Sequence, residues 1–452
     1  MGQKNNFSYT APVVKGISIF QKRIGELKVT EIAIIAATFF GNKGAEAMIS
    51  STIGKLREAY PEARFNVYSY YSKIDRTLVS DKKIEFYSAS PLYLVTVLNP
   101  FALIYKLLGY LRFNTLQQRC PESVKALARS KVLICLAGVS FVDGRTKFLP
   151  FNIATILPAM ILGTPVVKFA QAVGSFKNPV NAFFAQAFLK RCRMVFTRGN
   201  KTHEYLQGLL GGPCENVRRA NDIAFLFQPG FSLSKPELEN FPASKSLVES
   251  AKNAGKGVVG ICPSIVVHKK AEKAGWNYAD MVAKIVSALS CKGYHVVLFP
   301  NATRGSDASM RHNNDLPLIE NIFQELKEDE RKNTSLFTGL LNAAQIHEII
   351  RMCDIVAVSR FHAMIGALSL EIPVTVIGWS HKYLEVMELF EQEDMVLSYE
   401  EGHHENVVQN IIKLESERVQ RAEKIRKLLP EVRALAQSQV DYVCSLIEND
   451  RH

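Results

Sequence analysis

The sequence lacks the short motifs that mark the commonest cysteine, zinc and serine chemistries. Its eight cysteines include no CxxC pair, no HExxH occurs, and no GxSxG turn presents a serine nucleophile. Several cysteines, such as Cys135 and Cys262, lie inside apolar runs, which is typical of small core residues in a reducing compartment. These absences argue against a disulfide scaffold, a zinc protease of that type and a serine hydrolase, and we expect neither a metal nor another cofactor.

The chain also lacks a concentrated basic tract. It carries 55 Lys and Arg against 43 Asp and Glu, a net charge of +12, but the basic residues are scattered and no arginine-rich run is interleaved with aromatic residues. The excess suits an anionic ligand or an anionic membrane surface. Nucleic acid is not expected as a partner.

A signal core and a clean membrane span are missing as well. Residues 1–28 are polar and mixed, which predicts a flexible extension and favours a cytoplasmic protein. The longest apolar run, Leu92–Phe113, is interrupted by Asn99, Pro100 and Lys106. Since a spanning helix needs about 20 predominantly apolar residues, we expect a buried helix or one that rests on the membrane. Peripheral association with the inner face of the membrane stays open.

What the sequence does contain is an alternation of short β-rich apolar runs with longer helical patterns. The strand-like runs are Ile32–Ala37, Phe65–Tyr70, Val132–Ala137 and Pro165–Phe169, and then Gly257–Cys262, Tyr294–Phe299, Ile355–Val358 and Val374–Ile377. Helical patterns lie beside them. This order predicts an α/β fold with two Rossmann-like units, each built on a parallel sheet.

Composition shifts place the domain boundaries. Residues 228–254 contain several prolines and no clear period, which predicts a linker between an N-terminal domain, 29–227, and a C-terminal domain, 255–400. Residues 401–452 predict a helical tail that Pro430 kinks or divides. The cleft between two such domains is the expected ligand site.

The most informative segment is Ser359-Arg360-Phe361-His362, which ends a strand and opens a helix. A helix N-terminus suits phosphate or carboxylate, and Arg360 adds a bidentate donor for an oxyanion. His362 can give or take a proton. The alternative is that Arg360 pairs with a structural carboxylate and that His362 caps its helix, and the spacing does not decide between the two.

Other candidates lie in loops after strands of the first unit. Asn42 and Glu46, in a loop with neither the GxGxxG nor the P-loop spacing, can bond sugar hydroxyls. Gly138 and Asp143 mark a second loop, in which Asp143 can orient or deprotonate an acceptor hydroxyl. A plain turn is the alternative for both loops.

Three further candidates are weaker. Arg198 follows the run 194–197 and would lie near the same rim, although most single arginines are surface residues. Lys382 can neutralise a carboxylate or phosphate, and Tyr383 can stack on a sugar ring or pack in the core.

Taken together, these segments resemble the polysaccharide pyruvyl transferase family over about residues 32–400. The pieces that carry the resemblance are Gly41–Glu46, Gly138–Asp143, Gln171–Phe176, Thr197-Arg198, Asn221-Asp222, Asn314–Leu316, Ser359–Ala363 and Trp379–Tyr383. The resemblance implies a GT-B-like fold with two facing Rossmann-like domains. It also implies transfer of a pyruvyl group from phosphoenolpyruvate onto two hydroxyls of one sugar, which forms a cyclic ketal and releases phosphate.

The same resemblance implies roles for particular residues. Arg360 and His362, in the segment that starts at Ser359, would contact the donor, and Arg198 would reach it from the N-terminal domain. Lys382 would be a further anionic contact. Phosphoenolpyruvate is then a substrate and no cofactor is required. The acceptor is a sugar or a lipid-linked oligosaccharide whose identity the sequence leaves open, as it leaves open a homo-oligomer.

Two other functions remain open at this stage. A GT-B glycosyltransferase with a nucleotide-sugar donor would need a carboxylate for the ribose, for which Glu371 and Glu385 are candidates. A non-catalytic anion or glycan sensor on the same fold is the second, and the Arg360 and His362 pair argues against it.

Overall fold

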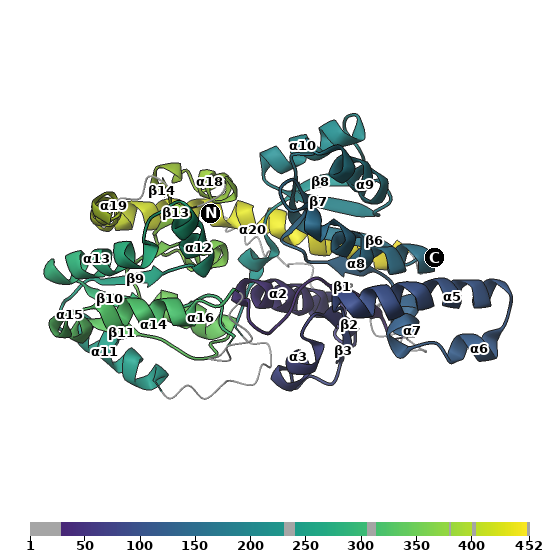
Figure 1. Cartoon of the computed structure of the whole chain (residues 1–452), viewed down its shortest axis with the longest axis horizontal. Helices are drawn as coiled ribbons and strands as arrows, with labels where there is room; N and C mark the ends of the chain where they lie inside the picture. Colours follow the sequence, from purple (N-terminus) through teal and green to yellow (C-terminus); the bar gives the residue numbers. More distant parts are fainter. Residues whose placement is uncertain (1–28, 230–239, 305–312, 379–380, 400–403, 450–452) are drawn as a thin grey trace, which may run out of the picture.

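The structure, a computed structural model, describes residues 29–229, 240–304, 313–378, 381–399 and 404–449, and it places two α/β domains side by side (Figure 1). The N-terminal sheet has the order β3-β2-β1-β4-β6-β7-β8, with β5 paired to β6, and its strands run parallel. Its strands are β1 (Glu31–Ile35), β2 (Arg64–Ser69), β3 (Ile84–Ser88), β4 (Leu133–Cys135), β5 (Val139–Val142), β6 (Val166–Gly174), β7 (Met194–Arg198) and β8 (Val217–Ala220). The helices of this domain are α2 (Lys43–Ala59), α3 (Ser72–Leu78), α4 (Pro91–Tyr93), α5 (Asn99–Tyr110), α6 (Asn114–Gln118), α7 (Glu122–Arg129), α8 (Leu149–Leu162), α9 (Pro179–Leu189) and α10 (Asn200–Leu210), with a π-helical turn at Leu94–Leu98 and 3₁₀ turns at Thr146–Phe148 and Ile223–Leu226.

The C-terminal sheet is also parallel and has the order β11-β10-β9-β12-β13-β14. Its strands are β9 (Val258–Cys262), β10 (His295–Leu298), β11 (Thr334–Leu336), β12 (Ile355–Val358), β13 (Val374–Gly378) and β14 (Val396–Ser398). The helices are α11 (Phe241–Asn253), α12 (Ile265–Lys273), α13 (Tyr278–Cys291), α14 (Leu316–Glu325), α15 (Glu328–Lys332), α16 (Ala343–Arg351), α17 (Phe361–Ser369), α18 (Lys382–Glu388), α19 (His404–Ser416) and α20 (Arg418–Asn449), with a 3₁₀ turn at Glu393–Met395. This is the Rossmann strand order, in which ligands bind where the order reverses at the carboxyl ends of the central strands. The predicted α/β fold of two Rossmann-like domains is confirmed.

The strands that the sequence predicted are those buried on both faces. All four residues of β12, for example, are buried, as expected for a parallel sheet covered by helices on both sides. The edge strand β8 was missed because its central residues, Arg218 and Arg219, are exposed and interrupt the apolar pattern. The segment 137–144, predicted as a loop, contains β5, which extends the sheet alongside β6.

The predicted linker, 228–254, extends too far toward the C-terminus. Its second half forms α11, which packs on the edge of the C-terminal sheet, where Ser244 donates a hydrogen bond to the carbonyl of Leu336 (2.7 Å). Helix α11 therefore belongs to the C-terminal domain. The predicted extension, 1–28, and the pair Trp379-Ser380 lie outside the described residues.

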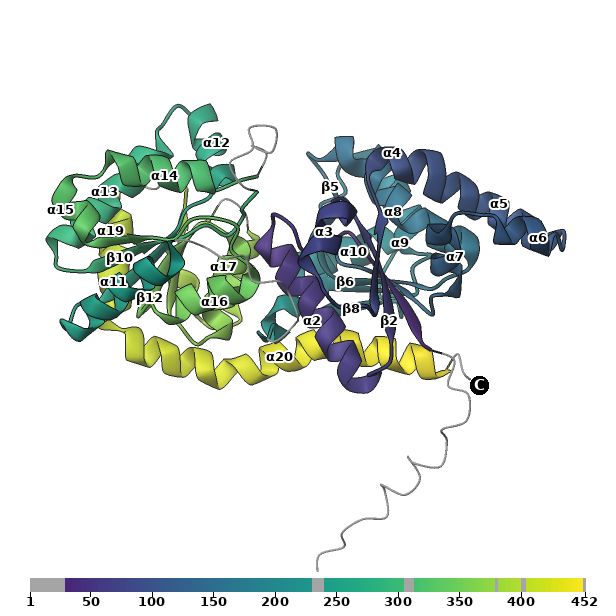
Figure 2. The ribbon, with the colours of Figure 1, turned by 90° about the horizontal axis from the view of Figure 1, so that it is seen from below.

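The helical tail connects the two domains. Helix α20 starts beside the C-terminal domain and runs across the N-terminal domain (Figure 2). There the buried side chain of Gln439 accepts a hydrogen bond from the backbone N–H of Ala170 (2.6 Å) and donates one to the carbonyl of Asn221 (2.8 Å). The tail divides between α19 and α20 and not at Pro430, which lies inside α20. The predicted helical tail therefore forms a strap that runs across both domains.

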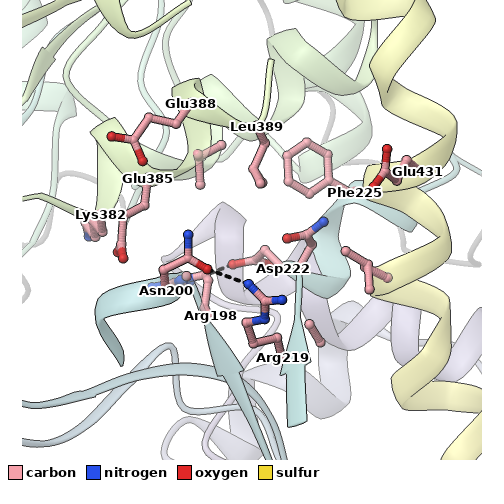
Figure 3. A pocket seen from close by; sticks show the side chains of 15 residues that line it. Arg198, Asn200, Arg219, Asp222, Phe225, Lys382, Glu385, Glu388, Leu389 and Glu431 are labelled. Carbon is pink, nitrogen blue, oxygen red and sulfur yellow. Dashed lines mark hydrogen bonds and ion pairs between the residues drawn. The ribbon is translucent and has the colours of Figure 1, made fainter. Parts of the chain in front are cut away.

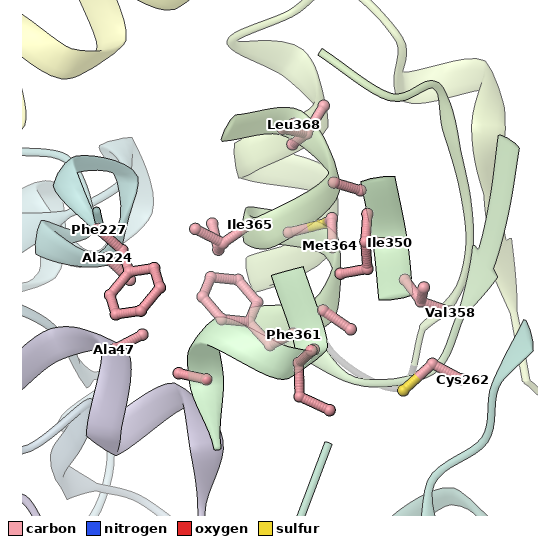
Figure 4. Packing of buried hydrophobic residues seen from close by; sticks show 14 of the residues in the cluster. Ala47, Ala224, Phe227, Cys262, Ile350, Val358, Phe361, Met364, Ile365 and Leu368 are labelled. Atoms are coloured by element: carbon pink, nitrogen blue, oxygen red, sulfur yellow. The ribbon is translucent and has the colours of Figure 1, made fainter. Parts of the chain in front are cut away.

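A shared apolar core holds the domains together near the site. Phe361 and Ile365 of α17 face Ala47 of α2 and the segment with Ala224 and Phe227 across the domain boundary (Figure 4). These side chains are buried, with Phe361 5% and Ile365 1% exposed. The buried apolar contact fixes the start of α17 against the N-terminal domain.

Candidate active site between the two domains

The site begins where β12 of one domain and β7 of the other end toward each other. Arg198, the last residue of β7, is buried, and its Nη1 lies 2.6 Å from Oδ2 of Asp222, the residue that precedes the 3₁₀ turn after β8. His362, in the first turn of α17, places its Nε2 3.6 Å from the same oxygen. One carboxylate therefore joins an arginine of its own domain to a histidine of the other domain.

The environment of Asp222 favours its charged form. Burial raises the pKa of this fully buried carboxyl, but the neighbouring His362 and Arg198 outweigh burial and hold the pKa well below the usual aspartate range. The other oxygen of Asp222 accepts a hydrogen bond from the backbone N–H of Ala224 (3.0 Å). Asp222 is thus an ionised, fixed partner for His362, whose buried Nε2 makes no hydrogen bond within the described part of the chain.

A second group of cations surrounds Phe361. The guanidinium carbon of Arg198 lies 4.5 Å from the centre of the Phe361 ring, and Nζ of the half-buried Lys382 lies 4.8 Å from it. Burial, together with the positive charges of Arg198, Arg145 and Arg360, lowers the pKa of Lys382 to about 7. The site therefore concentrates positive charge at the N-terminus of α17, where the helix dipole also favours an anion.

The first turn of α2 closes over His362. A Cβ atom built on Gly44 would lie 2.0 Å from Nδ1 of His362, so only glycine fits this position. Asn42 caps α2 by accepting a hydrogen bond from the Gly44 backbone N–H (3.2 Å), which fixes this turn. The sequence pointed to Asn42 and to the glycines of this segment, and the structure brings Gly44 to His362.

This contact yields a stability prediction. Gly44→Ala is expected to lower the free energy of unfolding by about 1–3 kcal/mol, because a methyl group forced against the His362 ring must displace α2 or α17. Gly54→Ala is the matched control, since a Cβ atom on Gly54, in the same helix, meets no atom within 4 Å. This control is expected to gain up to about 1 kcal/mol from helix propensity. Urea unfolding of both variants measures the difference, and equal stabilities would contradict the assigned contact.

Arg360 does not present a free guanidinium to the site. Its Nε lies 2.9 Å from Oδ2 of Asp315, its Nη2 also contacts that carboxylate, and its Nη1 donates to Oδ1 of Asn313 (2.9 Å). Asp315 is fully buried and also accepts from the backbone N–H groups of Ile265 (3.0 Å) and Ala302 (2.9 Å). These contacts match the alternative in which Arg360 pairs with a structural carboxylate. The Arg360–Asp315 pair connects the end of β12 to the segments that follow β9 and β10.

Two other carboxylates that the sequence predicted for the site, those of Glu46 and Asp143, are bound by other protein groups. Glu46 is buried, with Oε2 2.9 Å from Nζ of Lys43 and Oε1 accepting from the backbone N–H of Ala343 (2.7 Å) at the start of α16. Glu46 therefore links the two domains, and its contacts are not those of a residue that binds sugar hydroxyls. Asp143 accepts hydrogen bonds from Ser175, from the Lys177 backbone and from Asn181, and none of its recorded contacts reaches Arg198, Asp222 or His362.

Ser359 and Tyr383 support the cluster from behind. The Ser359 hydroxyl accepts a hydrogen bond from Tyr278 (2.7 Å), and the Tyr383 hydroxyl donates to the Ser359 carbonyl (3.1 Å). Both residues are 1% exposed. Of the two predicted roles of Tyr383, the contacts describe packing in the core, and a sugar does not reach its ring.

Two cavities flank the cluster. The smaller, about 280 Å³, is lined by Arg198, Asp222 and Lys382, and Figure 3 shows Lys382 and Glu385 of α18 facing the N-terminal domain across it. The larger, about 530 Å³, lies at the carboxyl ends of β1, β2 and β4. Gly138 lines the larger cavity, and its carbonyl accepts a hydrogen bond from Nη2 of Arg198 (3.1 Å). The backbone of Gly138 thus separates the cations from the larger cavity.

Sequence reasoning missed several residues of the site. Asp222 was noted only within the segments that carry the family resemblance. The structural carboxylate that could pair with Arg360 was not identified, and the structure shows that it is Asp315. The larger cavity has aromatic walls that include Tyr70 and Tyr71, at the end of β2. Their place after a predicted strand was the available signal, since such positions meet at one edge of a parallel sheet.

No group of three or more His, Cys, Asp or Glu side chains that could hold a metal ion occurs in the described ranges. The two carboxylates weighed for a nucleotide ribose are engaged by the protein itself. Glu371 pairs with Arg426 (2.7 Å), and Glu385 accepts from the backbone N–H of Lys201 (3.0 Å).

Solved structures of very different sequence share this architecture. UDP-GlcNAc 2-epimerase from Neisseria meningitidis bound to UDP-GlcNAc superposes with a TM-score of 0.54 at 10% identity, covering 92% of this chain and all of that one. A putative UDP-N-acetylglucosamine 2-epimerase from Listeria monocytogenes gives a TM-score of 0.53 at 11% identity, covering 91% and 94%. This likeness shows the two-domain, Rossmann-like fold of the GT-B type. No curated protein matches the chain in sequence.

The family comparison is more specific. The family model described as polysaccharide pyruvyl transferase matches residues 42–381, from the N-cap of the helix that covers His362 to the residue before Lys382. That range contains both Rossmann-like sheets except β1 and β14, and it contains Arg198, Asp222, Arg360 and His362. The chain therefore belongs to the polysaccharide pyruvyl transferase family and is an enzyme of this type.

Proposed function

We propose that the enzyme transfers a pyruvyl group from phosphoenolpyruvate onto two hydroxyls of a sugar in a polysaccharide or its precursor, forming a cyclic ketal and releasing phosphate. The observation that carries the proposal is the gathering of Arg198, Lys382 and His362 around Phe361 at the N-terminus of α17. Phosphoenolpyruvate bears a carboxylate and a phosphate close together, and a compact group of cations at a helix N-terminus is complementary to such a ligand.

The reaction requires one carbon to gain a proton and one C–O bond to break. Protonation of the methylene carbon of phosphoenolpyruvate gives an oxocarbenium-like centre, which one sugar hydroxyl attacks. The phosphate leaves with the bridging oxygen, and the second hydroxyl closes the ketal. Of the two hydroxyl protons, one balances the proton taken by carbon and the other leaves with phosphate. His362 beside ionised Asp222 is placed to move a proton, and Arg198 and Lys382 stabilise the charge on the leaving phosphate.

The lining of the larger cavity supports the proposal that the acceptor is a sugar. Its walls combine aromatic side chains, among them Tyr70, Tyr71 and Phe148, with polar groups that include Asn42 and Arg304. Aromatic faces pack against sugar rings, while a few polar groups fix the orientation of the hydroxyls. Because the Gly138 carbonyl accepts a hydrogen bond from Arg198 and Gly138 lines this cavity, an acceptor there lies next to the donor.

Thermal stabilisation by ligands tests the donor. Phosphoenolpyruvate at 100 times its dissociation constant is expected to stabilise the wild type by about 2.7 kcal/mol, and UDP-GlcNAc is expected to have no such effect. Lys382→Met is expected to lose most of the shift, whereas Lys201→Met, at an exposed lysine of the facing domain, keeps it. Stabilisation by UDP-GlcNAc alone would replace this proposal with a nucleotide-sugar enzyme.

The same measurement has a pH signature. With a pKa of about 7, Lys382 is mostly neutral above that pH in the free enzyme. A bound anion favours the charged lysine, so binding takes up a proton and the affinity falls as pH rises, by at most about tenfold per unit. Titrations at pH 7.5 and 8.5 are expected to show this fall in the wild type and in Lys201→Met but not in Lys382→Met. An identical pH dependence in all three proteins would rule out Lys382 as the contact.

A further inference from the structure

The helical segment 91–110 has no polar face. It spans α4, the π-helical turn and α5 over 20 residues, and an 18-residue window within it has a mean hydropathy of 1.5 although only 17% of that window is buried. Leu94, Leu98 and Ala102 pack into the N-terminal domain. The outward side is also largely apolar, with Lys106 as its one charged residue, whereas a surface helix of a protein surrounded only by water is mostly polar there.

The outward side carries an apolar face. It consists of Leu92 and Val95 at the start of the segment and of Leu103, Ile104, Leu107 and Tyr110 in α5. Leu92 is 74% exposed, Leu103 and Leu107 are each 51% exposed, and Tyr110 is 86% exposed. A contiguous exposed apolar patch marks an interaction site. Figures 1 and 2 show α5 at the end of the N-terminal domain that is remote from the C-terminal domain, so the closure of the two domains does not cover this face.

We propose that this apolar face docks on the surface of an anionic lipid bilayer, with α5 lying in the plane of the interface. The segment is long enough to cross a membrane, but one side of it is built into the folded domain. Asn99 donates a hydrogen bond to the carbonyl of Ala154 in α8 (3.0 Å), and Tyr93 is hydrogen-bonded to Ser123 (2.8 Å). Lipid therefore reaches the outward side alone, which is the arrangement of a helix that rests on the membrane.

Charge complementarity selects the anionic bilayer as the occupant. Residues 86–121 contain no Asp or Glu but include Lys106, Arg112 and Arg119, all exposed. Tyr110 and Phe113 add aromatic side chains of the kind that lie at lipid headgroup depth. Basic residues beside an apolar helix bind anionic lipid at about 1 kcal/mol each. A second copy of the chain would bring these cations together.

A third cavity, next to the apolar face, gives a functional reason for docking in this orientation. About 420 Å³ in volume, it lies between Pro91 and Val95 on one side and Phe148 and Phe151 on the other, beside the apolar face. Phe148 and Phe151, together with Tyr70, also line the larger cavity of the candidate active site. These three aromatic side chains therefore form a wall shared by the acceptor cavity and the cavity beside the apolar face.

Flotation of the full chain with vesicles tests the proposal. The wild type is expected to float with phosphatidylcholine vesicles that contain phosphatidylglycerol and to float less with pure phosphatidylcholine. Leu103→Glu/Leu107→Glu is expected to lower the partition coefficient by at least roughly tenfold, because two charged side chains would then lie on the face that contacts lipid. Leu247→Glu/Val419→Glu is the matched control, since both residues are exposed leucine or valine positions on α11 and α20, and it is expected to float like the wild type.

Two further readouts separate docking from misfolding and from dimerisation. Each variant is compared with the wild type by thermal unfolding, and Leu107→Trp is expected to gain fluorescence that brominated lipids quench, which a buried or water-facing residue would not show. The proposal is overturned if the wild type does not float with anionic vesicles, or if both double variants float equally well. It is also overturned if the wild type is a dimer that Leu103→Glu/Leu107→Glu converts to a monomer without any change in flotation.

Discussion

Replacing His362 by glutamine is expected to lower turnover by about 10²- to 10⁴-fold, the usual contribution of a positioned general acid or base. The imidazole is held from both sides, since Gly44 of α2 packs on its Nδ1 edge and Asp222 lies 3.6 Å from its Nε2. The ring is therefore held in one orientation, with the buried Nε2 directed at the ionised carboxylate of Asp222. Glutamine keeps a polar group of similar length but cannot transfer a proton near neutral pH.

Phosphate release from phosphoenolpyruvate, with an acceptor that the wild type accepts, measures this effect. His381→Gln is the matched control, because His381 lies just before Lys382 but is 47% exposed and contacts only Glu385 among its recorded ion pairs (3.9 Å). The control is expected to turn over normally. Stabilisation by phosphoenolpyruvate should persist in His362→Gln, which separates a lost proton transfer from a lost donor site. Near-normal turnover of His362→Gln would remove the histidine from the chemistry.

The second large effect is expected at Asp222. Asp222→Asn keeps the hydrogen bond to the Ala224 backbone but removes the charge that balances buried Arg198, and breaking a buried ion pair in this way costs about 3–5 kcal/mol of stability. Turnover should also fall, because His362 loses the carboxylate that orients it. Asp280→Asn is the control, since Asp280 forms only a half-exposed ion pair with Lys284 on α13 and such pairs contribute at most about 1 kcal/mol.

The pH dependence of this effect has a definite sign. Because the folded protein holds the pKa of Asp222 far below its value in the unfolded chain, the charged carboxylate contributes its full stabilisation above the unfolded pKa of about 3.9. That contribution is lost as pH falls toward the folded pKa. The difference in unfolding free energy between wild type and Asp222→Asn should therefore be complete at pH 7 and smaller at pH 3. Urea titrations at both values measure it, and a difference no larger than that of Asp280→Asn would refute the role of Asp222.

The placement of Arg360 changes how its own variants are interpreted. Since Asp315 and Asn313 occupy its guanidinium, Arg360→Ala would leave a buried carboxylate uncompensated and weaken the C-terminal domain. A lost ligand effect in that variant would not identify a donor contact. Lys382 and His362 are better reporters, because the contacts described for each lie within the cluster itself.

The sequence by itself determined the local elements and their order. Apolar runs such as Ile355–Val358 are long enough and uniform enough to predict buried parallel strands, and the residues after them begin helices at the carboxyl edge of the sheet. This was sufficient for the two Rossmann-like domains, whereas His362, Arg198 and Lys382 were grouped in one site only through the family resemblance. The sequence also indicated an apolar helix near residues 92–113, interrupted but free of acidic residues.

Only the tertiary structure decided which charges meet. Asp222 serves both Arg198 and His362, and Arg360 is neutralised by Asp315, because strand ends that are far apart in the chain converge between the domains. An ion pair between distant residues leaves no periodicity in the sequence. The strap formed by α20 and the exposure of Leu103 and Leu107 are decided in the same way, since a pattern of apolar residues shows that a face avoids water but not what covers it.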